Sequence, residues 1–310
     1  MKISMVICRF KEELGWLQHI PKEINVYVFN KNKDDIAVEN ATVYNKCQNI
    51  GRESEVYLRY ILQEYNNLPD IVIFTQGYPQ EHNRNFNHLV YRMSKEGLDQ
   101  DYYVLSSYWR DNEFPHPDIV KMYDGKVNYI ETASRYTLCP LKHWDEGIKG
   151  VYHDYIRLHP EIKAGDDIIN HFCRLIGLDD KDFGESHFFQ FGYSGIFAVR
   201  KEAILKHPLN FYFNCYSLNN RNDTYGFFFE KIASYQYSLS FSSFPITSLT
   251  SYSEAIIYGM LRLAFPPSWI ISINLDTHKE NRINGNASDH FLIRIDFVRN
   301  DTSIEEMRLH

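Results

Sequence analysis

The stretch that most constrains the fold is residues 49–83, NIGRESEVYLRYILQEYNNLPDIVIFTQGYPQEHN. It is typical of a glycine-containing turn, a helix, a short loop and a strand at residues 71–75 that is apolar on both faces. Such a strand belongs in the interior of a parallel sheet. Ligands of these sheets bind beyond the carboxyl ends of the strands and near helix amino-termini. The segment therefore predicts an α/β fold with a ligand crevice at one edge of its sheet.

Strands and helices alternate over the first 100 residues, which predicts βαβ units and a mostly parallel sheet. The predicted strands are residues 3–10, 25–30, 42–44, 71–75 and 102–106, and the predicted helices are residues 11–20, 54–65 and 86–95. Further helices are expected from Asp166 or Asp167 to Gly177 and over residues 223–235, with a strand-to-helix unit at 191–208. Residues 108–165 look less regular.

The predicted domain boundary lies at residue 245. Residues 1–245 are expected to form the α/β domain, and residues 246–310 a C-terminal extension of unknown role. In that extension we expect a helix at 253–263 and strands at 269–275 and 290–298.

Composition excludes several classes of protein. The formal net charge of −7 argues against an extended nucleic-acid interface. No run of about 18 apolar residues, the length needed to span a membrane, is present. The apolar run at the amino-terminus is too short for the core of a signal peptide. The five scattered cysteines are typical of reduced thiols in the cytoplasm.

Polar and cationic residues follow several of the predicted strands or open the predicted helix. They are Arg9 and Lys11, Asn30 and Lys31, Arg52 beside Gly51, and Gln76, Gly77 and His82. Strand ends of this composition bind phosphate-bearing ligands in α/β folds. The alternative is that these residues form ordinary polar turns. Neither a P-loop nor a G-x-G-x-x-G fingerprint follows the first strand, which disfavours ATPases and dinucleotide enzymes.

Two acids stand out downstream, Glu230 and Asp223. Glu230 lies in the apolar stretch FFFEKIAS, an environment that favours a general base. The alternative is a helix carboxylate paired with Lys231. The segment Tyr193-Ser194-Gly195 misses the G-x-S-x-G nucleophile elbow, and its small residues favour close approach of a ligand to the backbone.

Metal sites have little support from the sequence. The 13 histidines include no H-E-x-x-H motif, and no cysteine pair has the spacing of a zinc site. The one D-x-D triplet, residues 99–101, precedes a strand and is interpreted as a structural turn.

The motifs N-x-G-R-E at 49–53 and F-x-Q-G at 74–77, with VICRFKEELGWL before them and GYSGIFAVRKEAILKHP after them, resemble a domain family of fungi, bacteria and large viruses. That family is largely uncharacterised and is similar to nucleotide-sugar glycosyltransferases of the GT-A type. The resemblance covers about residues 1–235. It implies a GT-A-like three-layer α/β/α fold with a mostly parallel central sheet and a C-terminal appendage.

The resemblance implies a cytoplasmic glycosyltransferase, alternatively one peripheral to a membrane. It would transfer sugar from a nucleotide-diphosphate sugar to a glycan or glycoconjugate hydroxyl, in surface polysaccharide synthesis. The residues expected to bind the donor are Arg9, Asn30, Lys31, Asn49, Gly51, Arg52, Gln76, Gly77 and His82. Tyr193, Ser194 and Gly195 are expected on the acceptor side, with Glu230, and second Asp223, as the base.

The sequence departs from the GT-A pattern where a metal-binding D-x-D is expected, because Thr75-Gln76-Gly77 stands there. The resemblance implies a bound Mn²⁺ or Mg²⁺, while the residues themselves do not determine whether the protein depends on a metal ion. Two alternatives stay open: a non-catalytic carbohydrate- or nucleotide-binding protein on the same fold, and a hydrolase of phosphorylated sugars.

Overall fold

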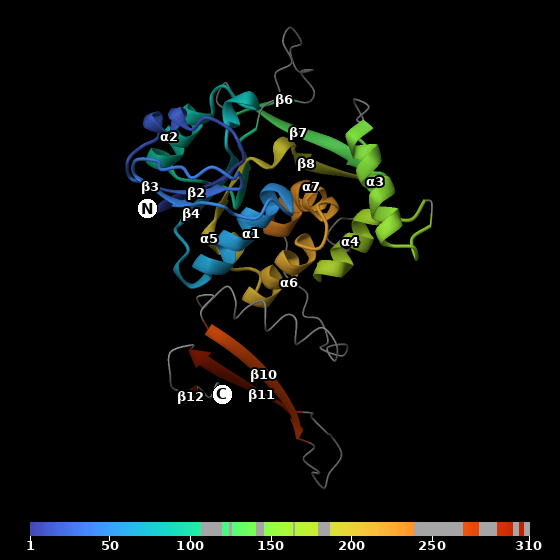
Figure 1. The fold of residues 1–310 in the computed structure, drawn as a ribbon. Helices are drawn as coiled ribbons and strands as arrows, with labels where there is room; N and C mark the ends of the chain where they lie inside the picture. Colours follow the sequence, from blue (N-terminus) through green and yellow to red (C-terminus); the bar gives the residue numbers. More distant parts are fainter. Residues whose placement is uncertain are drawn as a thin grey trace. The chain divides into compact units, whose positions relative to one another are not determined.

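The computed structural model describes residues 1–106, 120–123, 126–140, 146–163, 165–178, 187–238, 269–278, 290–299 and 304–306. The chain divides into two compact units, Met1–Phe244 and Pro245–His310. Each unit is described by itself, and Figure 1 shows the elements of both.

The first unit is built on a six-stranded sheet in the order β3-β2-β1-β4-β9-β5. Its strands are β1 (Ile3–Arg9), β2 (Ile24–Asn30), β3 (Ala41–Tyr44), β4 (Ile71–Gln76), β5 (Tyr102–Val104) and β9 (Phe197–Arg200). β1 to β4 pair in parallel, whereas β9 runs antiparallel to both β4 and β5. The prediction of an α/β fold with a mostly parallel central sheet is thereby confirmed.

β1 is the central strand, and its composition explains its position. All seven of its residues are buried, because β2 and β4 flank it and helices cover both faces. Successive side chains of a strand point to opposite faces. Val6 and Cys8 therefore enter one core, and Met5 and Ile7 the other.

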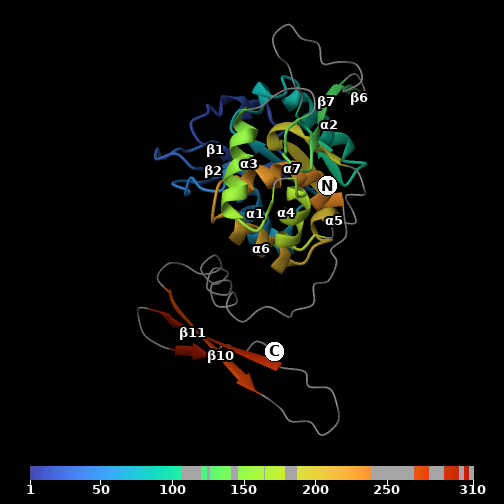
Figure 2. The same ribbon diagram turned by 90° about the vertical axis from the view of Figure 1, so that its right-hand side faces the viewer.

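Helices cover the two faces of the sheet unequally, which gives three layers (Figures 1 and 2). The larger core includes residues of α1 (Arg52–Glu64), α3 (Glu146–Leu158), α4 (Ile168–Ile176), α5 (Lys201–Ile204), α6 (Leu209–Asn219) and α7 (Thr224–Ser238). The opposite core contains α2 (Phe86–Glu96) and the short 3₁₀ helix η1 (Gly15–His19). A second sheet, in the order β6-β7-β8, consists of β6 (Val120–Tyr123), β7 (Lys126–Ser134) and β8 (Phe188–Gly192).

Several predictions of individual elements were wrong. The helix expected at 11–20 is only η1, because the Glu12 carboxylate accepts the backbone N–H groups of Phe10 and Lys11 and Gly15 disfavours a longer helix. The region 108–165, expected to be irregular, contains β6, β7 and α3. The helix α6 was not predicted. Its apolar residues do not gather on one face, since it packs against α1, α4 and α7.

The second unit contains an antiparallel sheet in the order β10-β11-β12. Its strands are β10 (Trp269–His278), β11 (His290–Arg299) and β12 (Ile304–Glu306), of which the first two were predicted. The register places Ile273 opposite Ile295 and Leu275 opposite Ile293. The helix predicted at 253–263 lies outside the described residues.

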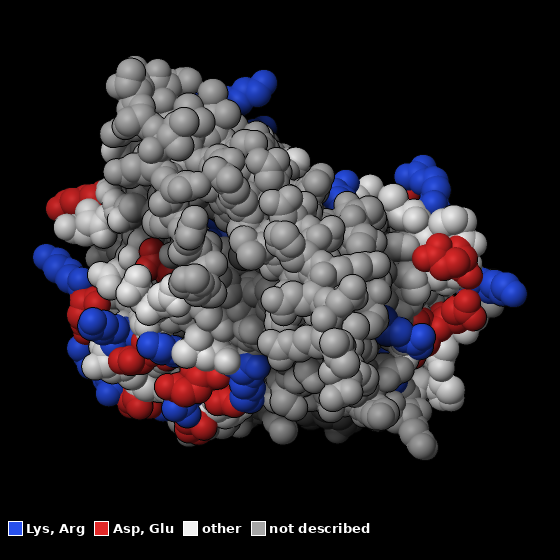
Figure 3. Space-filling model, turned by 90° about the horizontal axis from the view of Figure 1, so that it is seen from below, with Lys and Arg blue, Asp and Glu red and all other residues white. Residues whose placement is uncertain are grey.

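Among the described residues, no helix is both long and apolar enough to span a membrane, as the sequence predicted. On the face seen in Figure 3, acidic and basic side chains of the described residues lie interspersed.

Candidate functional site

The candidate site lies beyond the carboxyl ends of β1 and β4. From β1 the chain leads to β2 on one side, and α1 later returns it to β4 on the other side. The strand order therefore reverses between β1 and β4, and open α/β sheets bind their ligands at such a switch point. The start of α1, the residues after β4, the 3₁₀ turn η5 (Tyr193–Gly195) and the first turns of α7 surround it.

The start of α1 has an unusual backbone conformation that long-range contacts hold in place. Gly51 and Arg52 are both left-handed, with φ of 64° and 54°. The Gly51 N–H donates to Asp223 Oδ1 at 2.6 Å, and its carbonyl accepts from Asn219 Nδ2 at 2.8 Å. Asp223 therefore supplies a carboxylate to a backbone donor at a helix amino-terminus, where a negative charge is favourable. This contact gives Asp223 a positioning role.

Arg52 is the exposed cation at this helix start. Its guanidinium lies 4.0 Å from the centre of the Phe227 ring, and its Nε lies 3.6 Å from Glu53 Oε2. A Cβ atom on Gly226 would lie only 3.2 Å from Arg52 Cβ and 3.0 Å from the Gly51 oxygen. Glycine at 226 thus lets α7 approach the start of α1 closely.

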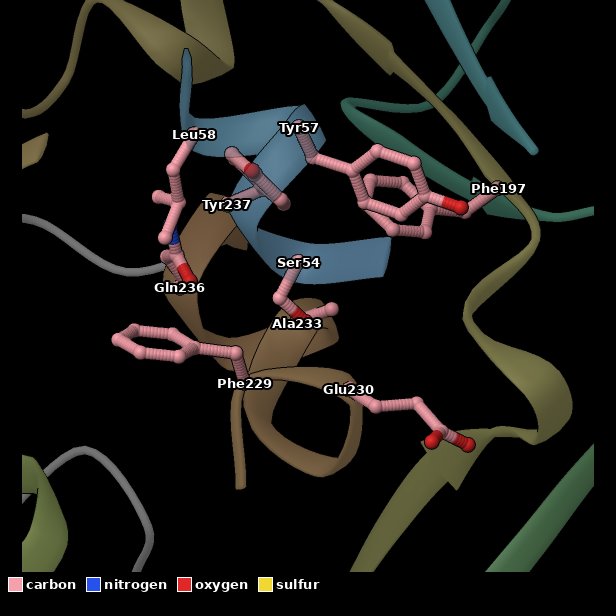
Figure 4. A pocket seen from close by; sticks show the side chains of 9 residues that line it. All are labelled: Ser54, Tyr57, Leu58, Phe197, Phe229, Glu230, Ala233, Gln236 and Tyr237. Carbon is pink, nitrogen blue, oxygen red and sulfur yellow. The ribbon is translucent and has the colours of Figure 1, made fainter. Parts of the chain in front are cut away.

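Glu230 lies on the first turns of α7, and 17% of its side chain is exposed. Its Oε1 is 3.5 Å from Lys231 Nζ, and that ammonium also lies 3.7 Å from the centre of the Phe191 ring. Gly195 abuts it, since a Cβ there would lie 3.4 Å from Glu230 Cγ. Glu230 lines a small cavity with Ser54, Tyr57, Leu58, Phe197, Phe229, Ala233, Gln236 and Tyr237. Figure 4 shows the Glu230 carboxylate pointing away from the apolar members of this set.

The cavity itself has room for about one water molecule, with about 20 Å³ of free space. It is too small for a sugar.

Acids from different parts of the chain act on the pKa of His82. Desolvation lowers this pKa below its ordinary value, while the charges of Glu81, Glu230 and Glu53 act in the opposite direction. His82 follows β4, Glu53 lies in the first turn of α1, and Glu230 lies on α7. Three elements far apart in the sequence thus bring titratable groups to one location.

Two buried polar atoms at the site lack hydrogen-bond partners among the described residues. They are the Tyr57 hydroxyl oxygen and the Gln76 amide nitrogen. Tyr57 lines the cavity beside Glu230, and Gln76 ends β4. An unsatisfied buried polar atom costs about 1–3 kcal/mol, and such atoms in native proteins often mark a ligand or water position.

Three predicted donor-binding residues are instead engaged in the interior. Arg9 donates to Asn30 Oδ1 at 2.8 Å and to both Asp34 oxygens at 3.1 Å. Lys31 donates to the Ile50 carbonyl at 2.7 Å. It also lies 3.1 Å from Glu55 Oε2, with 2% of the lysine side chain exposed. A phosphate at these cations would have to replace existing partners.

Gly77 lies against another carboxylate. A Cβ on Gly77 would be 2.6 Å from Glu12 Oε2, the oxygen that accepts from the amides of Phe10 and Lys11. The Gly77 carbonyl accepts from Trp16 Nε1 at 2.8 Å. Glycine at 77 therefore makes room for Glu12 at the ends of β1 and β4.

The remaining predicted residues are divided between the site and the surface. Ser194 and Gly195 have left-handed φ of 63° and 61° and lie beside α7. Nothing is described of the Tyr193 side chain, and Asn49 is exposed in the loop before α1.

The carboxyl end of β4 does not fit the Mn²⁺ or Mg²⁺ that the resemblance implies. These ions prefer several oxygen ligands, whereas Thr75-Gln76-Gly77 supplies no carboxylate and the neighbouring Glu12 oxygen already accepts from two backbone N–H groups. Within the described ranges, the one group of three converging His, Cys, Asp or Glu ligands is His159, Glu161 and His171, between α3 and α4. We therefore derive no step through a metal at β4. Asp101 of the D-x-D triplet pairs with Lys206 at 2.8 Å, as expected of a structural turn.

Sequence reasoning missed two members of the site, Tyr57 and Glu53. Tyr57 lies within the helix predicted at 54–65, and Glu53 is the last residue of the N-x-G-R-E motif, but neither was among the predicted site residues. Their position was the available signal: both lie near the start of a helix that precedes a buried strand.

Comparison with known proteins agrees with part of the resemblance. A model of the family "Protein of unknown function (DUF3431)" matches residues 5–112. Residues 5–112 thus match an uncharacterised domain family. The match contains both the N-x-G-R-E and the F-x-Q-G motif. No curated protein and no solved structure matches the chain.

Proposed function

We propose that the protein is a glycosyltransferase that moves a sugar from a nucleotide-diphosphate donor to a hydroxyl of a glycan or glycoconjugate. One observation carries the proposal: beside the switch point of the sheet, Glu230 lies against Gly195 and lines a cavity with Tyr57, whose hydroxyl has no hydrogen-bond partner among the described residues. Such a position suits a reaction on a ligand bound across the strand ends. Surface polysaccharide synthesis from the cytoplasmic side is the proposed context.

In the proposed reaction the Glu230 carboxylate takes the proton of the acceptor hydroxyl. The acceptor oxygen then forms a bond to the anomeric carbon. The bond from that carbon to the diphosphate breaks, and the nucleoside diphosphate leaves with the electron pair. Lys231 Nζ lies 3.5 Å from Glu230 Oε1 and helps to hold the carboxylate in place.

Arg52 is the cation proposed to stabilise the leaving diphosphate. Its side chain is 39% exposed, so it can reach a ligand, and it extends from the amino-terminus of α1. Phe227 holds one face of the guanidinium, and a phosphate oxygen would compete with Glu53 Oε2, 3.6 Å from Nε, for its edge. Arg9 and Lys31 stabilise the loops around this point from within.

The test measures release of nucleoside diphosphate and transfer of sugar with a panel of uridine and guanosine diphosphate sugars. We expect Glu230→Gln to lower kcat by about 10²–10⁴-fold, the usual effect of removing a general base. Arg52→Ala should lower kcat/KM. Asp223→Asn should keep most of the activity, since an amide oxygen can still accept from the Gly51 N–H.

Glu202→Gln is the matched control. Glu202 is 63% exposed on α5, which follows β9. β9 pairs Arg200 with Ile71, so α5 lies at the opposite edge of the sheet. Unchanged transfer by both Glu230→Gln and Arg52→Ala would refute the proposal.

The second candidate is a binding protein without catalysis. It is favoured by the end of β4, where Thr75-Gln76-Gly77 stands in place of the metal-binding D-x-D of the catalytic pattern. Calorimetry distinguishes the two functions: a nucleotide sugar that binds without any release of nucleoside diphosphate identifies the binding protein.

A further inference from the structure

A cluster of two histidines and a glutamate lies outside the candidate site. The side chains of His159, Glu161 and His171 each offer one ligand atom, and these atoms lie within 4.8 Å of one another. Glu161 Oε1 is 3.2 Å from His159 Nδ1 and 3.2 Å from His171 Nε2. The two imidazole rings meet edge to face with centres 4.8 Å apart.

Regular structure fixes the backbone on both sides of the cluster. His159 directly follows α3, and its N–H donates to the Tyr155 carbonyl at 3.0 Å. His171 lies near the start of α4, whose cap Asp167 accepts from the Asn170 N–H at 2.9 Å. Asp167 also pairs with Arg135 at 2.8 Å. The two histidines are therefore held by helix ends and not by a loose loop.

Each histidine contacts a tyrosine through its other ring nitrogen. His171 Nδ1 is 2.8 Å from the Tyr155 hydroxyl, and His159 Nε2 is 3.0 Å from the Tyr225 hydroxyl. Both tyrosines are buried, and Tyr155 stacks on Phe228 of α7 with ring centres 4.2 Å apart. When the outer nitrogens donate to these hydroxyls, the lone pairs of the inner nitrogens point toward Glu161. Metal-binding histidines usually have this kind of second hydrogen bond, which fixes the ring and its tautomer.

We propose that His159, Glu161 and His171 bind a first-row transition-metal ion of the zinc class. Two imidazoles and one carboxylate are a known ligand set for zinc. Zinc bonds of about 2.0–2.1 Å in a tetrahedral site place ligand atoms about 3.3 Å apart. The two separations of 3.2 Å from Glu161 Oε1 agree with that spacing, and the two imidazole nitrogens, which lie within 4.8 Å of each other, would move together on binding the ion.

The ion would connect the end of α3, the turn and the start of α4, and through Tyr225 it would fix them against α7. Three protein ligands leave a fourth position for water, and Glu161 is 59% exposed at this side of the cluster. The proposal does not depend on the proposed sugar transfer, because it rests on other residues and needs no substrate.

The test is titration of the full chain, stripped of metal, with ZnCl₂ in a calorimeter, and with CoCl₂ by visible absorption. We expect one ion per chain and cobalt absorption bands typical of a tetrahedral site. Mg²⁺ should give no heat of binding, because it prefers an octahedral set of oxygen ligands. Glu161→Gln, a change at an exposed position, should abolish the cobalt bands without unfolding the chain, and His171→Gln should do the same.

Tyr155→Phe tests the hydrogen bond behind the ligand. It should weaken zinc binding by about 10–100-fold and leave the ligands in place. His153→Gln is the matched control, since His153 is exposed on α3 and does not belong to the cluster. Circular dichroism of every variant verifies that it is folded.

Three results would overturn the proposal. They are the absence of zinc binding to the wild type, binding that survives in both folded Glu161→Gln and His171→Gln, and equal weakening by His153→Gln. In the first case the three side chains would be a hydrogen-bonded group that stabilises the turn before α4.

Discussion

Lys31 illustrates how one buried charge organises the loops around the candidate site. Its ammonium contacts the carbonyls of Ile50 and Arg52 and the carboxylate of Glu55, which is fully buried. The lysine thereby holds the chain at the point where it turns into α1. Its role is to shape the surface that a ligand would meet, and the contact with Glu55 connects it to the helix itself.

Replacement of Lys31 by methionine should destabilise the fold strongly. Loss of one partner of a buried ion pair costs roughly 3–5 kcal/mol, and the lower end applies because Arg59 still pairs with Glu55. Urea unfolding measures the difference. Lys46→Met is the control: Lys46 is 65% exposed and pairs with an exposed Asp35, so its loss should cost about 0–1 kcal/mol. Equal losses for both variants would contradict the structural role of Lys31.

At the scale of elements, α1 is the helix on which the site depends. It carries Tyr57 on its buried face and Arg52 and Glu53 at its start, and it packs against α6 and α7. Gly51, which directly precedes the first residue of α1, must be glycine for two reasons: its φ is 64°, and an added Cβ would lie 2.7 Å from Asn219 Nδ2. The start of α1 is therefore specified by local conformation and by α6 together.

We expect Gly51→Ala to lower the free energy of unfolding by at least about 1–2 kcal/mol, the cost of a left-handed backbone for a residue with a Cβ. The added Cβ would also push the Asn219 side chain away, which should weaken the contact between α1 and α6. Gly150→Ala is the matched control. Gly150 lies in α3 with nothing within 4 Å of an added Cβ, so this change should stabilise by about 0.5–1 kcal/mol. Thermal and urea unfolding of both variants measure the contrast, and a neutral Gly51→Ala would contradict it.

At the scale of the whole molecule, buried histidines should make stability depend on pH. Burial lowers the pKa of both His82 and His207. The charges of Glu81, Glu230 and Glu53 oppose this effect at His82, and the hydrogen bond to the Gln236 carbonyl opposes it at His207. The unfolded chain therefore binds protons near pH 6.5 that the folded chain does not bind. The free energy of unfolding therefore falls as the pH drops below about 6.5.

Each histidine should contribute a slope of at most about 1.4 kcal/mol per pH unit between its folded and unfolded pKa values. Urea midpoints at pH 8, 7, 6 and 5.5 measure the slope. It should become shallower in His82→Asn and stay unchanged in His153→Asn, which alters an exposed histidine. A wild-type stability that is level over this range would contradict the effect of burial.

The amino-acid sequence by itself determined the layered α/β fold. Apolar runs predicted β1, β2 and β4, and helical spacing predicted α1, α2 and α7, because these patterns record which faces are buried. The helix α6, whose apolar residues gather on no single face, was missed, and so was α3, although its buried residues recur at helical spacing.

Only the tertiary structure decided how the polar residues are used. Arg9 and Lys31 ended strands as predicted, but packing surrounded them with Asp34 and Glu55, so they stabilise loops. Asp223 reached Gly51 across 172 positions of sequence, which no local pattern encodes. His159 and His171 lie together because the turn after α3 leads to the start of α4, where His171 contacts Tyr155, and their spacing fits no zinc motif. Burial patterns are local and repeat along the chain, whereas a site depends on long-range contacts that form only on folding.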